Sequence, residues 1–273
     1  MKRRPIRGIA GLSRRQPIGA VLTIGRKGSK GFPVEKDRFH LVLPHEGPDG
    51  RRAPHPRYTR FNTADPEHRR SLVCQIVHSD AEQAFEYYLS AYRGRRGDPT
   101  HPAGAPFCRG DGDRAQRYTG NDSDPDGFAS IDCAGSECPY QTATPPLCRP
   151  FARLAFRVDF KPGSGMPATI CRYQTKSWHT VANLAGFFDM LRDAADLVGA
   201  PFVPAGFRFC LQLEIRKSKM NGGSRFPVVR AIPLDDPFSF FAARSAAAPV
   251  ADDNHALPDP AFGALPDGGM ETG

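Results

Sequence analysis

Four cysteines lie in a part of the chain that is poor in aliphatic residues. They are Cys108, Cys133, Cys138 and Cys148, with the spacing C-x24-C-x4-C-x9-C. Thiolate sulfur is a preferred ligand of Zn²⁺, and structural zinc sites take four tetrahedrally arranged ligands. Metal binding can also order a segment that buries little apolar surface by itself. We therefore expect a structural Zn²⁺ held by these four thiols.

Other interpretations of this segment stay open. It has no C-x2-C pair, so unpaired loop thiols and a redox or catalytic role are alternatives. A further alternative is that His101 takes the place of one of the four cysteines as a zinc ligand. Asp111 and Asp113, in the stretch GDGD, are interpreted as part of a glycine turn rather than as a general acid–base pair, since two acids this close in sequence, without an evident base or open catalytic metal, are weak evidence of catalysis.

The remaining three cysteines occur in a different context. Cys74, Cys171 and Cys210 each lie inside an apolar run that is typical of a strand. Free cysteine behaves as a small hydrophobic residue in such places. We expect these three to pack rather than to bind metal.

Charge is distributed unevenly over the 273 residues, whose net charge is +8. Residues 1–30 hold nine Lys or Arg and no acid, whereas residues 246–273 hold five acids and no Lys or Arg. A basic body with an acidic tail fits work near nucleic acid or an acidic protein surface, although solubility alone is an alternative. The candidate nucleic-acid contacts are Arg14, Arg15, Arg26, Lys27 and Lys30.

The elements that must position these residues follow from periodicity. Alternating or β-branched runs predict strands at 18–25, 37–43, 71–77, 152–160, 168–175, 207–219 and 225–234. Apolar residues at helical spacing predict helices at 79–92 and 180–199. The expected fold is α+β, with a mixed or antiparallel sheet, two main helices and an inserted loop-rich cysteine module.

Domain boundaries follow from composition. Residues 1–244 are expected to form one domain, with the cysteine module inserted at about 100–150. Residues 245–273 are rich in Ala, Pro, Asp and Gly and are expected to be a disordered acidic tail. No apolar run is long enough to span a bilayer, so a cytoplasmic protein without a membrane partner is expected.

Lys176 and Trp178 lie just before the second predicted helix, in the stretch TKSWHT. Trp178 is the only tryptophan in the chain. Anchoring of Trp178 in the core is the favoured interpretation, and an exposed partner contact made by Lys176 and Trp178 is the other candidate.

Several stretches, taken in chain order, resemble one family. They are RRQPIGAVLTIGRKG, KGFPVEKDRF, CRGDGDRA, CAGSEC followed by CRP, ICRYQTKS, and the late LEIRKSK and FPVV. The chain is similar to the recombination directionality factors of phage large serine integrases, some of which are described only as metal-binding proteins. It differs in its long Pro- and Arg-rich loop near 45–70 and in its acidic tail.

The resemblance implies a non-enzymatic role in the cytoplasm of a bacterial host, encoded by a phage or an integrated element. Such a factor binds a large serine integrase at its coiled-coil region. Binding switches recombination from attP × attB to attL × attR, and attachment-site DNA is contacted indirectly or weakly. Two alternatives are a zinc-stabilised DNA-binding accessory protein and a metal-dependent hydrolase, although four cysteine ligands would close the metal site of the latter.

Overall fold

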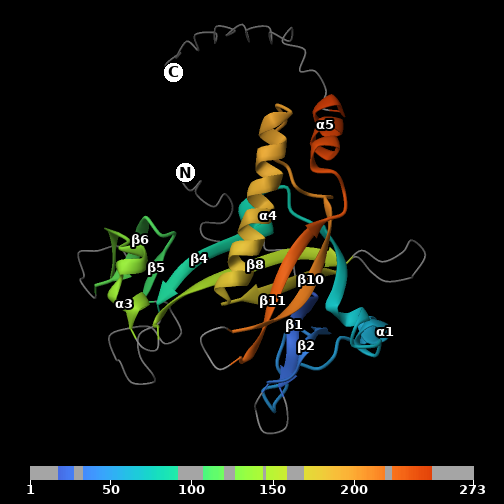
Figure 1. The fold of residues 1–273 in the computed structure, drawn as a ribbon, viewed down its shortest axis with the longest axis horizontal. Coiled ribbons are helices and arrows are strands. Elements are labelled where there is room, and N and C mark those ends of the chain that lie inside the picture. The colour runs from blue at the N-terminus through green and yellow to red at the C-terminus, as the bar shows by residue number, and fades with distance from the viewer. Residues whose placement is uncertain are drawn as a thin grey trace, which may run out of the picture.

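A single mixed sheet is built around strand β8 (Cys148–Val158). One edge of β8 pairs with β9 (Ile170–Thr175). The other edge pairs with β4 (Phe85–Ala91) along its first half and with β3 (Ser71–Ile76) along its second. The sheet therefore divides into two branches at β8 (Figure 1). The computed structural model describes residues 18–27, 33–91, 107–119, 127–143, 146–158, 169–218 and 223–247.

The first branch is here called the wing. It runs from β4 through three short antiparallel strands and carries two short helical turns. Its further elements are β5 (Cys108–Gly110), β6 (Arg114–Tyr118), β7 (Phe128–Asp132), η4 (Gly135–Glu137) and α3 (Pro139–Thr142). The cysteine segment lies between β4 and β8 in the chain, but its described part is not the expected loop-rich module, because β5, β6 and β7 pair in series with β4 and continue the main sheet.

The second branch continues from β3 to β10 (Arg208–Lys217) and β11 (Arg225–Pro233). On the far side of β8, β9 pairs with β1 (Ala20–Lys27), which pairs with β2 (Pro33–Val42). The β1–β9 pairing is parallel and the other strand pairings are antiparallel. This confirms the mixed α+β class.

Helix α4 (Trp178–Leu197) covers one face of the sheet, and the helix predicted at 180–199 is confirmed. Its N-terminus is capped by the Ser177 hydroxyl, which accepts a hydrogen bond from the Thr180 backbone at 3.4 Å. Phe187 and Phe188 point into the core, and Phe188 stacks on Phe85 of β4 with ring centroids 4.9 Å apart. This packing fixes the helix across both branches.

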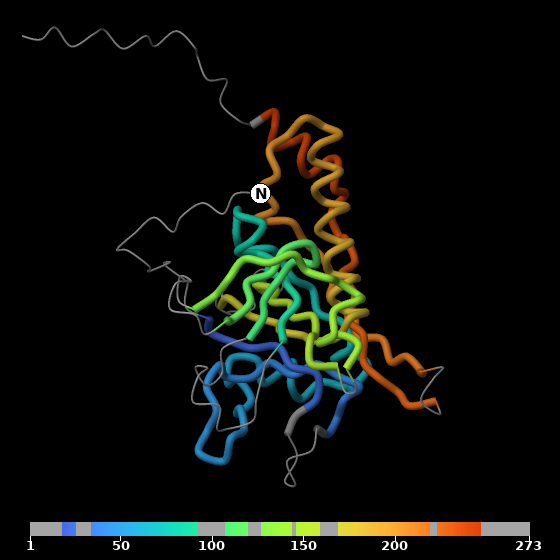
Figure 2. Tube along the Cα trace, turned by 90° about the vertical axis from the view of Figure 1, so that its left-hand side faces the viewer, coloured from blue at the N-terminus to red at the C-terminus, as the bar shows by residue number. Residues whose placement is uncertain are grey.

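A second helix, α5 (Pro237–Ala247), was not predicted from the sequence. It packs beside α4, and the two helices rise together beyond the sheet (Figure 2). Phe241 of α5 is fully buried, and Phe240 packs edge-on to Phe207 at 5.0 Å. The boundary expected at residue 244 therefore falls inside α5, and residues 248–273 lie outside the described part of the chain.

Short helical turns fill the connections between strands. Buried Arg69 fixes one of them to the sheet by donating from Nε to the carbonyl of Phe39 in β2 at 3.3 Å. These turns are η1 (Pro56–Tyr58), α1 (Thr59–Asn62), η2 (His68–Arg70) and α2 (Ala81–Ala84).

The predicted strands are confirmed as β1, β2, β3, β8, β9, β10 and β11, with small shifts at their ends. The helix predicted at 79–92 is wrong. Its first residues form only the four-residue α2, and the remainder is β4. Pairing of FEYYLSA with the free edge of β8 outweighs the helical spacing of its aromatic residues. None of the described helices is both long and apolar enough to cross a bilayer.

Candidate cysteine site and partner-binding surface

The wing and the start of β8 bring the four predicted cysteines near one another. Ala91 of β4 pairs with Cys108 of β5 on one side and with Cys148 of β8 on the other. Residues that pair directly across strands point to the same face, so these two thiols flank Ala91. Cys133 follows β7, where its backbone N–H donates to the carbonyl of Asp113 at 2.8 Å. Cys138 precedes α3, and its carbonyl accepts from the Gln141 N–H at 2.8 Å.

Burial and mutual proximity raise the pKa values of two of these thiols. Cys108, Cys138 and Cys148 are buried, while Cys133 is half-buried. Burial, followed by the neighbouring Cys138, Cys108 and Cys133, raises the pKa of Cys148 to about 11. Burial also raises the pKa of Cys108, opposed by a hydrogen bond from Arg117. The four sulfur atoms therefore lie close enough to influence one another electrostatically.

The donor set fits Zn²⁺ chemically, but the ligands are not in a coordinating arrangement. All seven cysteines are free, so no disulfide competes for the thiols. Among the described residues, no three His, Cys, Asp or Glu side chains are grouped closely enough to hold a metal ion. His101 lies outside the described residues. A metal would have to draw the four thiols inward and release their protons.

Of the three cysteines expected to pack inside strands, two are fully buried. Cys74 and Cys171 are fully buried in β3 and β9, as expected for small hydrophobic side chains. Cys210 is half-buried, and its Sγ lies 3.6 Å from the Ser71 hydroxyl across the β10–β3 pair. None of the three lies on the wing.

The GDGD stretch is a hairpin turn between β5 and β6. The Asp111 carboxylate accepts from the backbone N–H of Asp113 at 2.9 Å and of Arg114 at 2.8 Å. Gly112 has φ +114°, a conformation that favours glycine. This confirms the turn interpretation.

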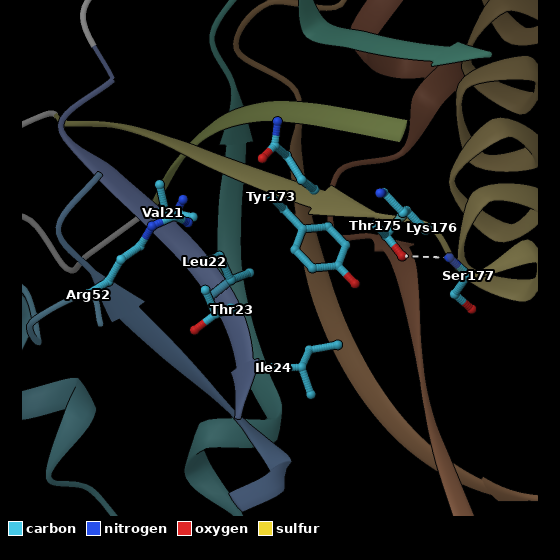
Figure 3. Close-up of a pocket in the computed structure, with 10 residues that line it drawn as sticks. Val21, Leu22, Thr23, Ile24, Arg52, Tyr173, Thr175, Lys176 and Ser177 are labelled. Atoms are coloured by element: carbon cyan, nitrogen blue, oxygen red, sulfur yellow. Dashed lines mark hydrogen bonds between the residues drawn. The ribbon is translucent and has the colours of Figure 1, made fainter. Parts of the chain in front are cut away.

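A pocket opens where β1 and β9 separate (Figure 3). The two strands pair only as far as Leu22 and Tyr173, and beyond that point they diverge around a volume of about 440 Å³. The residues that line it come from β1, from the end of β9 and its following turn, and from Arg52. They include hydroxyl groups and cations but no carboxylate or histidine, so they do not form a general acid–base pair.

Both predicted partner-contact residues lie at this end of the molecule. Lys176 lines the pocket and is exposed. Trp178 begins α4, and 49% of its surface is exposed. The favoured expectation of a core anchor is therefore wrong for Trp178.

The predicted nucleic-acid contacts are only partly described. Arg14, Arg15 and Lys30 lie outside the described residues, and Arg26 and Lys27 form the end of β1.

Sequence reasoning missed a different basic surface, here called the arginine face. Five arginines from β5, β8 and β9 lie on the side of the sheet turned away from α4, and β4 lies between β5 and β8. Glu86 pairs with two of them, and the guanidinium of one lies 3.7 Å from the centroid of the Tyr88 ring. The arginine face consists of Arg109, Arg149, Arg153, Arg157 and Arg172. The spacing of 149, 153 and 157 was visible in the sequence, because strand residues an even number apart share a face.

The comparisons with known proteins match this chain to a family. A model of the Gp3-like family, described as recombination directionality factor-like, matches residues 17–233. The chain belongs to this family. No curated protein and no solved structure matches it.

The match to the Gp3-like family spans all four wing cysteines and most of the sheet. It begins just before β1 and ends with β11, so α5 and the acidic tail lie outside it. The suspected family resemblance is therefore confirmed, and directionality-factor families are not catalytic families.

Proposed function

We propose that this protein binds a large serine integrase and switches it from attP × attB integration to attL × attR excision. The observation that carries the proposal is the match of residues 17–233 to the directionality-factor family. The cognate contact on the integrase is its coiled-coil region. The protein acts by binding and has no small substrate to turn over.

The mechanism is a coupling of two binding equilibria. A factor that binds two conformations of an integrase–DNA complex equally well does not change the equilibrium between them. It must therefore bind the synaptic geometry of attL × attR more tightly than that of attP × attB. A preference of about 3 kcal/mol changes their ratio more than a hundredfold.

Purified components test the proposal directly. The integrase encoded by the same genetic element is incubated with attL and attR substrates, with and without this protein. Excision products should appear only when the protein is present. The protein and the integrase should also elute together as a stable complex in size-exclusion chromatography. Equal excision in both reactions, together with the absence of a complex, would overturn it.

We also propose that one structural Zn²⁺ is held by Cys108, Cys133, Cys138 and Cys148. The support is that the wing and the start of β8 gather these thiols around a small apolar cluster. Among the described residues of this apolar cluster, Phe107 is the one large apolar side chain that is buried. Zn²⁺ would supply the binding energy that links β5, β8 and the turn around α3.

DNA contact at the arginine face is the second candidate function. A guanidinium binds phosphate through two parallel hydrogen bonds, and an aromatic ring beside it can stack on a base. Arg153→Ala combined with Arg157→Ala should weaken binding to a fluorescent DNA duplex and reduce its salt dependence by about two units of slope. Unchanged binding and slope would exclude this face.

A further inference from the structure

Helix α4 has one side that no other described element covers. Residues three or four apart on a helix share a side, and the exposed positions of α4 recur at this spacing. Figure 1 shows α4 in front of the sheet, and Figure 2, a side view, shows the sheet on one side of the helix. The α4 outer face consists of Trp178, Ala182, Gly186, Asp189, Met190, Asp193, Asp196 and Leu197.

Gly186 lowers the stability of this helix, and no close contact with another described residue requires a glycine there. It lies in the middle of the 20-residue α4 and is exposed. A Cβ atom added there would meet nothing within 4 Å. Glycine is the least favourable non-proline residue in a helix interior. With Ala182 one turn earlier, it leaves a smooth stretch that a second backbone can approach closely.

Large apolar side chains bracket the smooth stretch. Trp178 is 49% exposed at one end, and Leu197 is 76% exposed at the other. Met190 is also exposed, one turn after Gly186. A face about 28 Å long, at 1.5 Å per residue, thus presents apolar groups with a shallow centre between them.

The C-terminal half of the face is acidic, although the chain has a net charge of +8. Asp189 pairs with Arg192 at 3.8 Å. Asp193 and Asp196 have no cationic partner among the described residues, and the last turn of α4 contains no basic residue. Carboxylates near a helix C-terminus are unfavourable because the helix dipole is negative there. Cations supplied by a partner would remove this cost.

We propose that the α4 outer face docks a helix of the partner protein. That helix places small or apolar residues over Ala182 and Gly186 and directs Lys or Arg side chains toward Asp193 and Asp196. The inference rests on the proposed function and identifies the docking surface for a helix of the integrase coiled coil. Charge complementarity and helix-on-helix packing support this occupant over an extended peptide, which would leave the smooth centre unfilled.

A variant that fills the shallow centre separates binding from folding. Gly186→Gln adds a side chain outward and replaces glycine with a better helix former. Its melting temperature should equal or exceed that of the parent, while its affinity for the purified integrase, and for the isolated coiled-coil region, should fall by about tenfold or more. Ala243→Gln is the matched control, because it adds the same side chain to an exposed position of α5. It should bind like the parent.

Charge reversal tests the acidic half of the face. Asp193→Lys combined with Asp196→Lys should weaken the complex by about tenfold, with a larger loss at low salt than at high salt. Asp65→Lys combined with Glu82→Lys makes the same change in net charge at exposed positions away from α4 and should leave affinity unchanged. Similar losses in both pairs would show a general charge effect and overturn the proposal.

Failure of the inference and failure of the proposed function are distinguishable. If the parent protein binds the integrase and Gly186→Gln binds equally well, the proposed function stands and the α4 outer face is excluded. If the parent does not bind the integrase at all, the proposed function itself fails. Analytical ultracentrifugation of the protein alone tests whether two copies of this chain associate through the α4 outer face. A dimer that Gly186→Gln dissociates would make this face a self-interface and overturn the proposal.

Discussion

Cys148 and Cys108 are placed by backbone pairing on either side of Ala91, so their positions do not depend on a metal. Burial raises the pKa of Cys148 to about 11, and a thiol in that state stays protonated at neutral pH. Thiolates become favourable in such an environment when a cation neutralises them. The Zn²⁺ proposed above would therefore stabilise the wing by neutralising these thiolates.

Cys138→Ser tests the proposed zinc site. Purified protein that has never met a chelator should contain about one Zn per chain, and this variant should lose it. Its unfolding free energy should fall by more than about 2 kcal/mol, because metal binding contributes directly to folding. Elemental analysis and thermal unfolding provide the two measurements. Cys210→Ser should keep its metal, and an absence of zinc in the parent would refute the site.

His55 gives the folded state a predictable dependence on pH. Its imidazole is buried, and its Nδ1 accepts a hydrogen bond from the Arg57 backbone at 3.2 Å. Burial lowers the pKa of the ring, opposed by a hydrogen bond with Gly19 and assisted by the charge of Arg57. The unfolded chain, with a histidine pKa of about 6.5, therefore takes up a proton first as the pH falls.

The sign of the pH effect follows from that order. His55 contributes fully to the free energy of unfolding when the pH is above the pKa of this histidine in the unfolded chain. The contribution is lost as the pH falls below that value. Urea denaturation should give a lower unfolding free energy at pH 5.5 than at pH 7.5. His55→Asn keeps a side-chain acceptor for the Arg57 N–H and should make the dependence shallower. An unchanged slope would contradict the assignment.

At the scale of elements, α4 connects the two branches of the sheet. The ring of Phe187 in α4 contacts two other rings. Its centroid lies 5.3 Å from that of Phe209 in β10 and 5.5 Å from that of Phe188 in α4. Phe188 contacts Phe85 of β4, which belongs to the other branch. The aromatic residues on the inner side of α4 thus stabilise the arrangement of the branches.

Phe187→Ala should destabilise the protein by about 3–5 kcal/mol, because it removes a buried ring and leaves a cavity. Leu197→Ala, in the same helix but 76% exposed, should change the unfolding free energy by less than about 0.5 kcal/mol. Denaturant unfolding of both variants makes the comparison. Equal effects would show that α4 does not pack on the sheet as described.

At the scale of the whole molecule, α5 is the last described element. Deletion of residues 248–273 should leave the melting temperature nearly unchanged, since the segment lacks the apolar content to form a core. Deletion from residue 237 should lower it by several degrees or more, because Phe241 is fully buried. Calorimetry of the two truncated proteins distinguishes them. A large loss from the shorter deletion would show that the tail docks on the body.

Sequence alone determined the features that depend on local pattern. Alternation identified seven strands, and 3.6-residue periodicity identified α4. The grouping of cysteines in an aliphatic-poor segment was also visible, and so was the family resemblance. Each of these signals lies within a few residues of its neighbours or in the order of short motifs, so no knowledge of distant contacts is needed.

Only the tertiary structure decided which strands meet. β3 and β4 occupy the same edge of β8, with Cys74 opposite Val158 and Phe85 opposite Leu154, and this pairing turned an expected helix into a strand. The arginine face and the α4 outer face likewise appear only after the two sides of the sheet and helix are assigned. Strand pairing joins residues far apart in sequence and depends on which edges remain free, and a local pattern carries no information about those edges.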